Sequence, residues 1–276
     1  MEEEKKLKLM ANKIRQHIIK MIHSAQSGHP GSSLSCVELL VLLYFHELKH
    51  DFKKPNWSER DHFILSKGHA CPTQYACLAE SNYFSVEELM TFRKINSHLQ
   101  GHPAAHKTKG IEASTGPLGT GLSIANGIAL GKRIDKIDSF TFVLMGDGEL
   151  QEGMIWEAAM TSGFRKLNKL IAFVDWNDLQ IDGKVSEIKE VAPIEKKFEA
   201  FGWNTLKCNA PDFNELLNAI TEAKKSKEKP TVIVLKSIKG KGVSFMENKC
   251  EWHGVAPNDE EAKQALEELK KESDSL

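Results

Sequence analysis

The sequence predicts an α/β protein in which a mostly parallel sheet carries helices on both faces. Continuous apolar runs at 140–145, 170–174 and 231–235 are typical of strands buried on both sides. Segments with helical spacing of apolar residues separate these runs, so strand and helix alternate along the second half of the chain. With 41% hydrophobic and 27% charged residues, the chain can bury a sizeable core.

The remaining elements follow from periodicity and from Gly, Pro and Asp at segment ends. We see no internal repeat or linker, so we expect residues 1–276 to form one domain, ending in a charged helix or tail at about 257–276. A long loop rich in Gly, Pro and His is expected at 97–119, and loops of that length are usually functional. Helices are expected at 9–24, 35–48, 119–133, 152–164, 193–201 and 212–225, with two more within 71–95, and further strands at 63–65 and 203–208.

The bulk properties exclude several classes of protein. Lys and Arg total 37 against 38 Asp and Glu, and this formal net charge of -1 argues against a nucleic-acid binder. No apolar run is long enough to span a membrane, and the charged N-terminal segment lacks the apolar centre of a signal peptide. The five cysteines never form C-x-x-C, and we expect them to be reduced in a cytoplasmic protein.

Two polar residues follow successive predicted strands. Asp147 lies in Gly146-Asp147-Gly148 after the run at 140–145, and Asn177 follows the next run. Ligands of parallel sheets bind beyond the carboxyl ends of the strands, and Mg²⁺ prefers a few protein oxygens together with phosphate and water. Each segment alone is also compatible with an ordinary turn. Together they predict a magnesium and diphosphate site, with small glycines that let backbone N–H groups approach the phosphates.

The chain resembles transketolases in eight segments that occur in the order of that family. The spacing of Asp147 and Asn177 is similar to the G-D-G…N signature of thiamine-diphosphate enzymes. The matching segments are GHPG at 28–31, LSKGHA at 65–70, QGHP at 100–103, TGPLGTG at 115–121, GDGELQEGMIWEA at 146–158, DWNDLQIDG at 175–183, IKGKG at 238–242 and WHG at 252–254.

This resemblance implies the thiamine-diphosphate-binding fold, specifically the diphosphate-type domain of transketolase. It implies thiamine diphosphate as the cofactor and Mg²⁺ as the metal, with Ca²⁺ or Mn²⁺ as alternatives. The implied metal ligands are Asp147, Asn177 and the carbonyl of Leu179. The implied cofactor-binding residues are His69, Gly116, Pro117, Leu118, Gly146, Asp147, Gly148, Glu149, Asn177 and His253.

The resemblance also gives four loop histidines a role. His29 and His253 would lie near the reacting hydroxyls of the substrate, His102 near its C1 hydroxyl, and His69 near the diphosphate and the reacting centre. Imidazole titrates near neutral pH, which suits proton transfer to and from sugar hydroxyls. Glu152 resembles an acid at the family's subunit contact, although a Glu at a helix N-terminus is also favoured by the helix dipole alone.

The implied activity is transfer of a two-carbon ketol unit from a ketose phosphate to an aldose phosphate, as in the pentose phosphate pathway. In the family a Glu that activates the cofactor lies on a second, pyrimidine-binding domain, and the sequence does not continue into that domain. We therefore expect the N-terminal subunit of a split transketolase, inactive alone, that dimerises and assembles as α2β2 with a separate C-terminal subunit. No nucleic acid or membrane partner is expected.

Three alternatives are weighed against this expectation. A 2-oxoacid dehydrogenase alpha subunit would share the G-D-G…N pair but not GHPG, LSKGHA and TGPLG together. A split transketolase-type enzyme for a branched or sulfo-sugar phosphate stays open, because the specificity residues are expected on the other subunit. A non-catalytic paralogue is disfavoured because the metal ligands and all four motif histidines are present.

Overall fold

A computed structural model describes residues 2–276 and contains the predicted parallel sheet. Its five strands lie in the order β1-β2-β3-β7-β6, and every neighbouring pair is parallel. Continuous apolar runs form the three central strands, because both faces of the sheet are covered there, whereas the edge strand at 204–209 is largely polar. The strands are β1 (His62–Leu65), β2 (Thr141–Gly146), β3 (Leu170–Trp176), β6 (Asn204–Asn209) and β7 (Thr231–Lys236).

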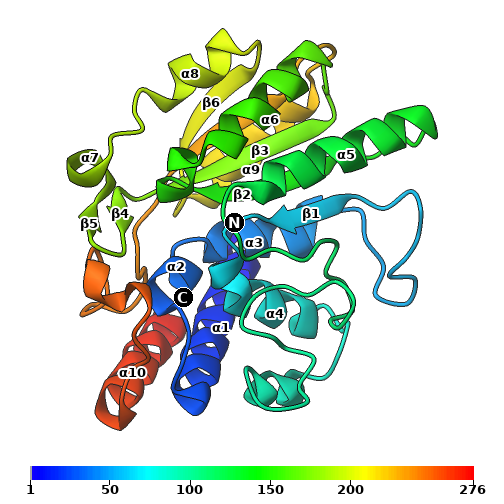
Figure 1. The fold of residues 1–276 in the computed structure, drawn as a ribbon. Coiled ribbons are helices and arrows are strands. Elements are labelled where there is room, and N and C mark those ends of the chain that lie inside the picture. Colours follow the sequence, from blue (N-terminus) through cyan, green and yellow to red (C-terminus); the bar gives the residue numbers. More distant parts are fainter. Residues whose placement is uncertain (1) are drawn as a thin grey trace.

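Helices cover the two faces of the sheet as separate layers (Figure 1). One layer contains α5 (Thr120–Ile134), α6 (Gly153–Phe164) and α8 (Ile194–Ala200). The other contains α1 (Glu2–Ala25), α3 (Val37–Leu42), α4 (Cys71–Glu80), α9 (Phe213–Lys224) and α10 (Asp259–Ser275). This arrangement confirms the predicted α/β fold class.

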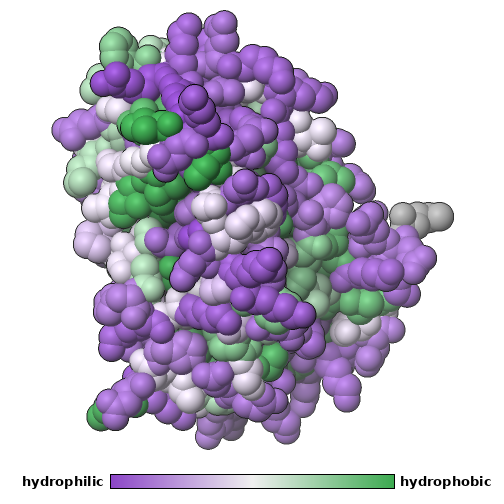
Figure 2. Space-filling view, turned by 90° about the vertical axis from the view of Figure 1, so that its right-hand side faces the viewer, coloured by the Kyte–Doolittle hydropathy of each residue, from purple (hydrophilic) through white to green (hydrophobic). Residues whose placement is uncertain are grey.

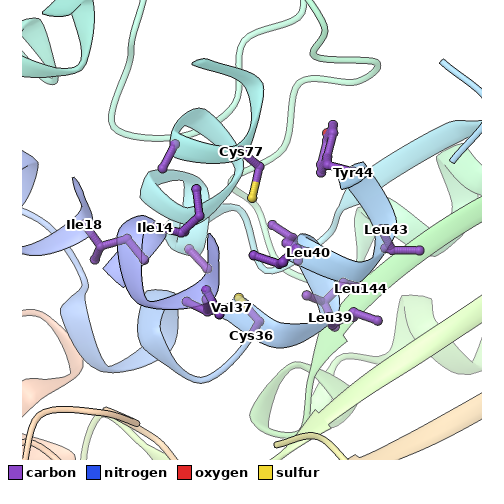
Figure 3. Close-up of a cluster of buried hydrophobic side chains, with 14 of the residues drawn as sticks. Ile14, Ile18, Cys36, Val37, Leu39, Leu40, Leu43, Tyr44, Cys77 and Leu144 are labelled. Atoms are coloured by element: carbon purple, nitrogen blue, oxygen red, sulfur yellow. The ribbon is translucent and has the colours of Figure 1, made fainter. Parts of the chain in front are cut away.

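Each layer has its own buried apolar cluster against the sheet. Alternate residues of one strand serve the two clusters: Phe173 packs with the cluster of α1, and Val174 packs with the cluster of α5. Figure 3 shows part of the first cluster, which joins Ile14 of α1 with Val37 and Leu40 of α3. The helices on both faces are therefore held by burial of apolar area, which contributes about 25 cal/mol per Å².

Some element bounds differ from those expected from the sequence. Helix α1 begins at Glu2, because Glu2–Lys6 and Glu4–Lys8 pairs stabilise its exposed first turns before the buried stripe begins at Leu7. The segment predicted as one helix at 35–48 is α3 followed by a π-helical turn, Leu43–Glu47. Within 71–95 only α4 is an α-helix, and the second segment, Val86–Thr91, is a 3₁₀ helix.

Three short elements were not expected, and all lie at the carboxyl edge of the sheet. They are α2 (Pro30–Leu34), the hairpin of β4 (Leu179–Gln180) and β5 (Gly183–Lys184), and α7 (Val185–Ile188). Elements of two to five residues leave too little periodicity to be read from sequence. In Figure 1 they gather with the chain that precedes α10 on the left of the sheet.

The register of the sheet places the ends of β2 and β3 side by side. Gly146 is the partner of Asp175, so the next residues of both strands emerge at the same edge. The N–H of Asp147 donates to the carbonyl of Asp175 (3.2 Å), which continues the pairing one step beyond the strands. Parallel pairing thus brings the loops that carry Asp147 and Asn177 together.

The surface is mostly polar, with a few exposed apolar side chains. The face drawn in Figure 2 is largely hydrophilic, with a band of hydrophobic residues at its upper left. Exposed large apolar residues on α5 and α6 include Ile134, Met160 and Phe164. Among residues 2–276, no helix is both long and apolar enough to cross a membrane.

We predict that Phe173→Ala lowers the free energy of unfolding by about 3–5 kcal/mol, because the residue is fully buried and stacks on Phe142 in the middle of the sheet. Urea denaturation of the wild type and the variant measures this change. Ile95→Ala is the control: Ile95 is 92% exposed, so truncation of this apolar side chain should have little effect. Equal losses for the two variants would contradict the described packing.

Candidate active site at the carboxyl edge of the sheet

A cavity of about 310 Å³ opens at the carboxyl edge of the sheet. It is formed by loops after β1, β2 and β3, by the long loop before α5, and by segments before α2 and α10. The predicted site residues that line it are His29, His69, His102, Gly116, Leu118, Gly146, Asp147, Gly148, Glu149, Glu152, Asn177, Leu179 and His253. Pro117 is not in this lining: it is exposed, and its carbonyl accepts a hydrogen bond from the Thr120 hydroxyl.

Asp147 connects the loops that follow β2 and β3. It is 3% exposed, and one carboxylate oxygen accepts hydrogen bonds from the backbone N–H groups of Asn177 (3.0 Å) and Asp178 (2.6 Å). The other oxygen accepts from the N–H of Gly148 (2.8 Å). Burial, together with the nearby Asp175 carboxylate, raises the pKa of Asp147 to about 6 despite these hydrogen bonds. A buried carboxylate of this kind favours a bound cation, which would offset the cost of its desolvation.

Asn177 and Leu179 also line the cavity, in the loop whose backbone N–H groups bond Asp147. The side-chain oxygen of Asn177 accepts from the N–H of Leu179 (3.1 Å), and Asp178 between them has a left-handed backbone (φ 60°) that turns the loop. Together with Asp147, these residues provide one carboxylate, one amide oxygen and one backbone carbonyl. These donors fit a hard divalent cation such as Mg²⁺, which takes oxygen ligands and shares them with phosphate.

The four motif histidines come from four separate segments and meet at one end of the cavity. The ring centroid of His29 lies 5.2 Å from that of His69, 6.2 Å from His102 and 5.6 Å from His253. The rings of His69 and His253 stack at 5.2 Å. The buried Nδ1 of His29 has no hydrogen-bond partner within residues 2–276, so it can still accept or donate a bond to a ligand.

The expectation that these imidazoles titrate near neutral pH is wrong for the protein without ligand. Burial lowers the pKa of His29 to about 4, with Arg93 adding to the effect. Burial and Lys239 lower the pKa of His253 to about 3, and the pKa values of His69 and His102 are also lowered by burial. The four imidazoles are therefore neutral at pH 7. A neutral imidazole can accept a proton from a substrate hydroxyl when negative charge develops on that oxygen during a reaction.

Both carboxylate oxygens of Glu149 accept hydrogen bonds from other residues of the chain. Its Oε1 accepts from the Ser66 hydroxyl and from the N–H of Gly119 (2.9 Å), and its Oε2 accepts from the N–H of Gly146 (3.0 Å). Gly119 needs its left-handed conformation (φ 87°) to start α5 there, and a side chain would meet Glu152. Glu149 thus fixes the start of α5, and the loop before it, against the end of β2. Glu152 is exposed at the cavity rim and precedes α6.

The sequence patterns did not reveal a buried ion pair beneath the site. The Lys67 ammonium contacts the Asp175 carboxylate and also donates to the carbonyl of Ser32 (2.9 Å). Asp175 further accepts bonds from the hydroxyls of Ser35 (2.6 Å) and Ser237. Burial would raise the pKa of Asp175, but Lys67 and the two hydroxyls hold it below its usual value. The sequence offered one clue to this ion pair: Lys67 and Asp175 are charged residues at the ends of apolar runs.

A family model described as "Transketolase, thiamine diphosphate binding domain" matches residues 6–275. A 6-deoxy-6-sulfo-D-fructose transketolase subunit of Clostridium sp. (strain MSTE9) is 42% identical over 98% of both chains. One of the apulose-4-phosphate transketolase subunits, from Actinobacillus succinogenes, is 41% identical over 98% of this chain and 97% of that protein.

Longer transketolases match over part of their length. The human transketolase is 38% identical over 95% of this chain but only 42% of its own length. The crystal structure of the Campylobacter jejuni transketolase superposes with a TM-score of 0.91 at 36% identity, covering 96% of this chain and 42% of that one. This chain thus spans nearly all of the subunits named above and less than half of the longer enzymes.

We predict that the ion pair of Lys67 and Asp175 behaves as one unit. Lys67→Met and Asp175→Asn should each cost about 3–5 kcal/mol of stability, because each leaves a buried charge without its partner. The double variant should cost clearly less than the sum of the two, as measured by urea denaturation. Asp138→Asn, which breaks the exposed pair with Lys169, serves as control and should change stability little. Additive losses at Lys67 and Asp175 would refute the coupling.

We predict that stability falls as the pH drops from 6.5 towards 4. The pKa of His29 is about 4 in the folded chain against 6.5 when exposed, so in this window the unfolded chain binds protons that the folded chain does not. Urea midpoints across this range should fall less steeply for His29→Asn than for the wild type. His106→Asn, in an exposed loop, should keep the wild-type slope. An NMR titration of the His29 ring with a midpoint near 6.5 would contradict this account.

Proposed function

Because this chain belongs to the transketolase family and carries its thiamine-diphosphate-binding domain, we propose that it is the N-terminal subunit of a two-subunit transketolase. On this proposal, residues 1–276 form one diphosphate-type domain, and the enzyme transfers a two-carbon ketol unit from a ketose phosphate to an aldose phosphate. The observation that carries the proposal is the convergence of Asp147, Asn177 and the Leu179 carbonyl on a cavity that also holds four histidines.

In this proposal the chain's own residues bind, orient and transfer protons. Asp147, Asn177 and the Leu179 carbonyl would hold Mg²⁺, with Ca²⁺ or Mn²⁺ as substitutes, and the metal would hold the diphosphate. Gly146 and Gly148 line the cavity beside these ligands, where their small size lets phosphates approach the backbone. Thiamine diphosphate, when bound, supplies the thiazolium carbon at which the ketose is cleaved between C2 and C3.

The histidines would handle the substrate's hydroxyl protons. His29 and His253 are neutral and close together, so either can accept a proton as the carbon–carbon bond breaks and return it in the reverse step. His102 lies farther from His29 than the other two rings do and would bond the C1 hydroxyl. His69 stacks on His253 and would pack close to the cofactor.

A second subunit would close the cavity. We propose that the partner is a C-terminal, pyrimidine-binding subunit, that this chain also self-associates, and that the α2β2 assembly has Glu152 at the contact. Two observations support this: the relatives matched along nearly their whole length are named as subunits, and apolar residues of α5 and α6 are exposed. All five cysteines are free thiols, which supports a reducing, cytoplasmic setting. A role in the pentose phosphate pathway would follow from the proposed ketol transfer between sugar phosphates.

A specialised substrate is the second candidate. The relatives with 42% and 41% identity are named for 6-deoxy-6-sulfo-D-fructose and for apulose 4-phosphate. The residues that choose between these sugars and common ketose phosphates are expected on the partner subunit, so the cavity of this chain does not decide between them. A substrate panel that tests the proposed function therefore includes them.

We predict that this chain, mixed with the separately encoded pyrimidine-binding subunit, Mg²⁺ and thiamine diphosphate, catalyses ketol transfer, whereas this chain alone does not. The assay follows product formation from fructose 6-phosphate, xylulose 5-phosphate, 6-deoxy-6-sulfo-D-fructose and apulose 4-phosphate with aldose acceptors. Asp147→Ala should reduce turnover at least roughly 100-fold, because the metal loses its only carboxylate.

Asp274→Ala is the matched control for that assay. Asp274 is exposed near the end of α10, away from the cavity, and its loss should leave the rate unchanged. Turnover by the purified chain alone would overturn the two-subunit proposal. Full activity of Asp147→Ala in the mixture would overturn the metal site.

A further inference from the structure

Lys239 lies buried beside the proposed metal ligands. The residue is 1% exposed, and its ammonium donates hydrogen bonds to the carbonyl oxygen of Leu179 (2.9 Å) and to Nδ1 of His253 (2.8 Å). The first acceptor is the same oxygen that the proposed metal would take. The second fixes His253 with Nδ1 as the acceptor, and so with its proton on Nε2. Neither bond has a part in the function proposed above.

The surrounding backbone holds Lys239 in this place. The N–H of Gly240 donates to the carbonyl of Gly31 (3.0 Å), and the N–H of Asn248 donates to the carbonyl of Lys239 (2.9 Å). The Lys239 side chain also passes close to Gly31, where an added Cβ would lie 3.1 Å from its Cγ. The stem of the side chain is therefore confined, and only its charged end can move.

A divalent cation and this ammonium cannot share the Leu179 carbonyl. Both are hard cations that bind oxygen, and like charges repel strongly at such short range in a buried site. A metal ion that arrives alone must displace the ammonium, which then has no new partner. A metal ion that arrives with a diphosphate brings anionic oxygens, and these provide the displaced ammonium with a charge-assisted hydrogen bond.

We propose that Lys239 is a positioning residue that occupies the metal's place until metal and diphosphate bind together. The ammonium keeps the Leu179 loop in its ligand-binding shape in the empty protein and prevents a free metal ion from settling there. Displacement of the ammonium also releases Nδ1 of His253. This proposal rests on the function proposed above, because it assumes the metal site of Asp147, Asn177 and Leu179.

The test measures metal binding rather than turnover. Mn²⁺ binding to the full chain without cofactor is followed by electron paramagnetic resonance, for the wild type, Lys239→Met and Lys239→Gln. Both variants should bind free Mn²⁺ about tenfold more tightly than the wild type, because the competing charge is gone. Lys241→Met removes the same charge from the same loop, and it should behave as the wild type because Lys239 is the lysine that bonds Leu179 and His253.

A second experiment measures the affinity of the chain for thiamine diphosphate by equilibrium dialysis at saturating Mn²⁺. Loss of the ammonium should weaken binding of the cofactor about tenfold in the Lys239 variants, while thiamine, which has no phosphate, should show no difference. The opposite changes in metal and cofactor affinity distinguish a place-holding ammonium from a residue that merely supports the fold. Unchanged or weaker Mn²⁺ binding in both Lys239 variants would overturn the proposal.

Two further measurements distinguish a failure of the Lys239 proposal from a failure of the proposed function. Circular dichroism shows whether the Lys239 variants fold. If they do not, Mn²⁺ binding to the wild type still tests the proposal. Tight, Asp147-dependent binding of Mn²⁺ without cofactor would refute the proposed role of Lys239. Asp147→Asn added to Lys239→Met should abolish Mn²⁺ binding. If Mn²⁺ binding persists in that double variant, the metal site itself is wrong, and the function proposed above fails with it.

Discussion

The candidate active site of this protein depends on one carboxylate, which joins the loops that follow two neighbouring strands. Asp147 follows β2, yet it accepts hydrogen bonds from backbone N–H groups of Asn177 and Asp178 after β3. Parallel pairing of the two strands brings these segments together, and the carboxylate then fixes the loop that lines the cavity. The backbone hydrogen bonds only partly offset the effect of burial on the pKa of Asp147, which stays raised, and a nearby positive charge would lower it further. These features support the proposed metal site.

Positive charge is already distributed around this carboxylate. Lys67 is paired with the carboxylate of Asp175, which also accepts hydrogen bonds from two hydroxyls. Lys239 instead donates to a carbonyl oxygen and an imidazole nitrogen, which are neutral acceptors. Neutral acceptors compensate a buried ammonium less fully than a carboxylate does. The two lysines therefore differ: one is a fixed part of the scaffold, and the other is available to respond to an anion. The same positive charges help to keep the neighbouring histidines neutral, because they lower the pKa of His69 and His253.

The sequence predicted the fold class and the regular elements well where the signal was strong. The apolar runs of β2, β3 and β7 and the amphipathic spacing of α9 follow directly from burial, so their places were predictable to within a few residues. Prediction was poorer where short elements depend on tertiary contacts. The π-helical turn after α3, the 3₁₀ helix at Val86–Thr91 and the β4–β5 hairpin are too short for periodicity to show.

By itself, the sequence determined which residues could form a cofactor site, because Asp147, Asn177 and the Gly-flanked histidines occur in ordered motifs. It could not determine the electrostatics of that site. The low pKa values of the histidines, the pairing of Lys67 with Asp175 and the contact of Lys239 with the Leu179 carbonyl arise between residues far apart in the chain. Burial and long-range approach set charge interactions, and both exist only in the folded chain.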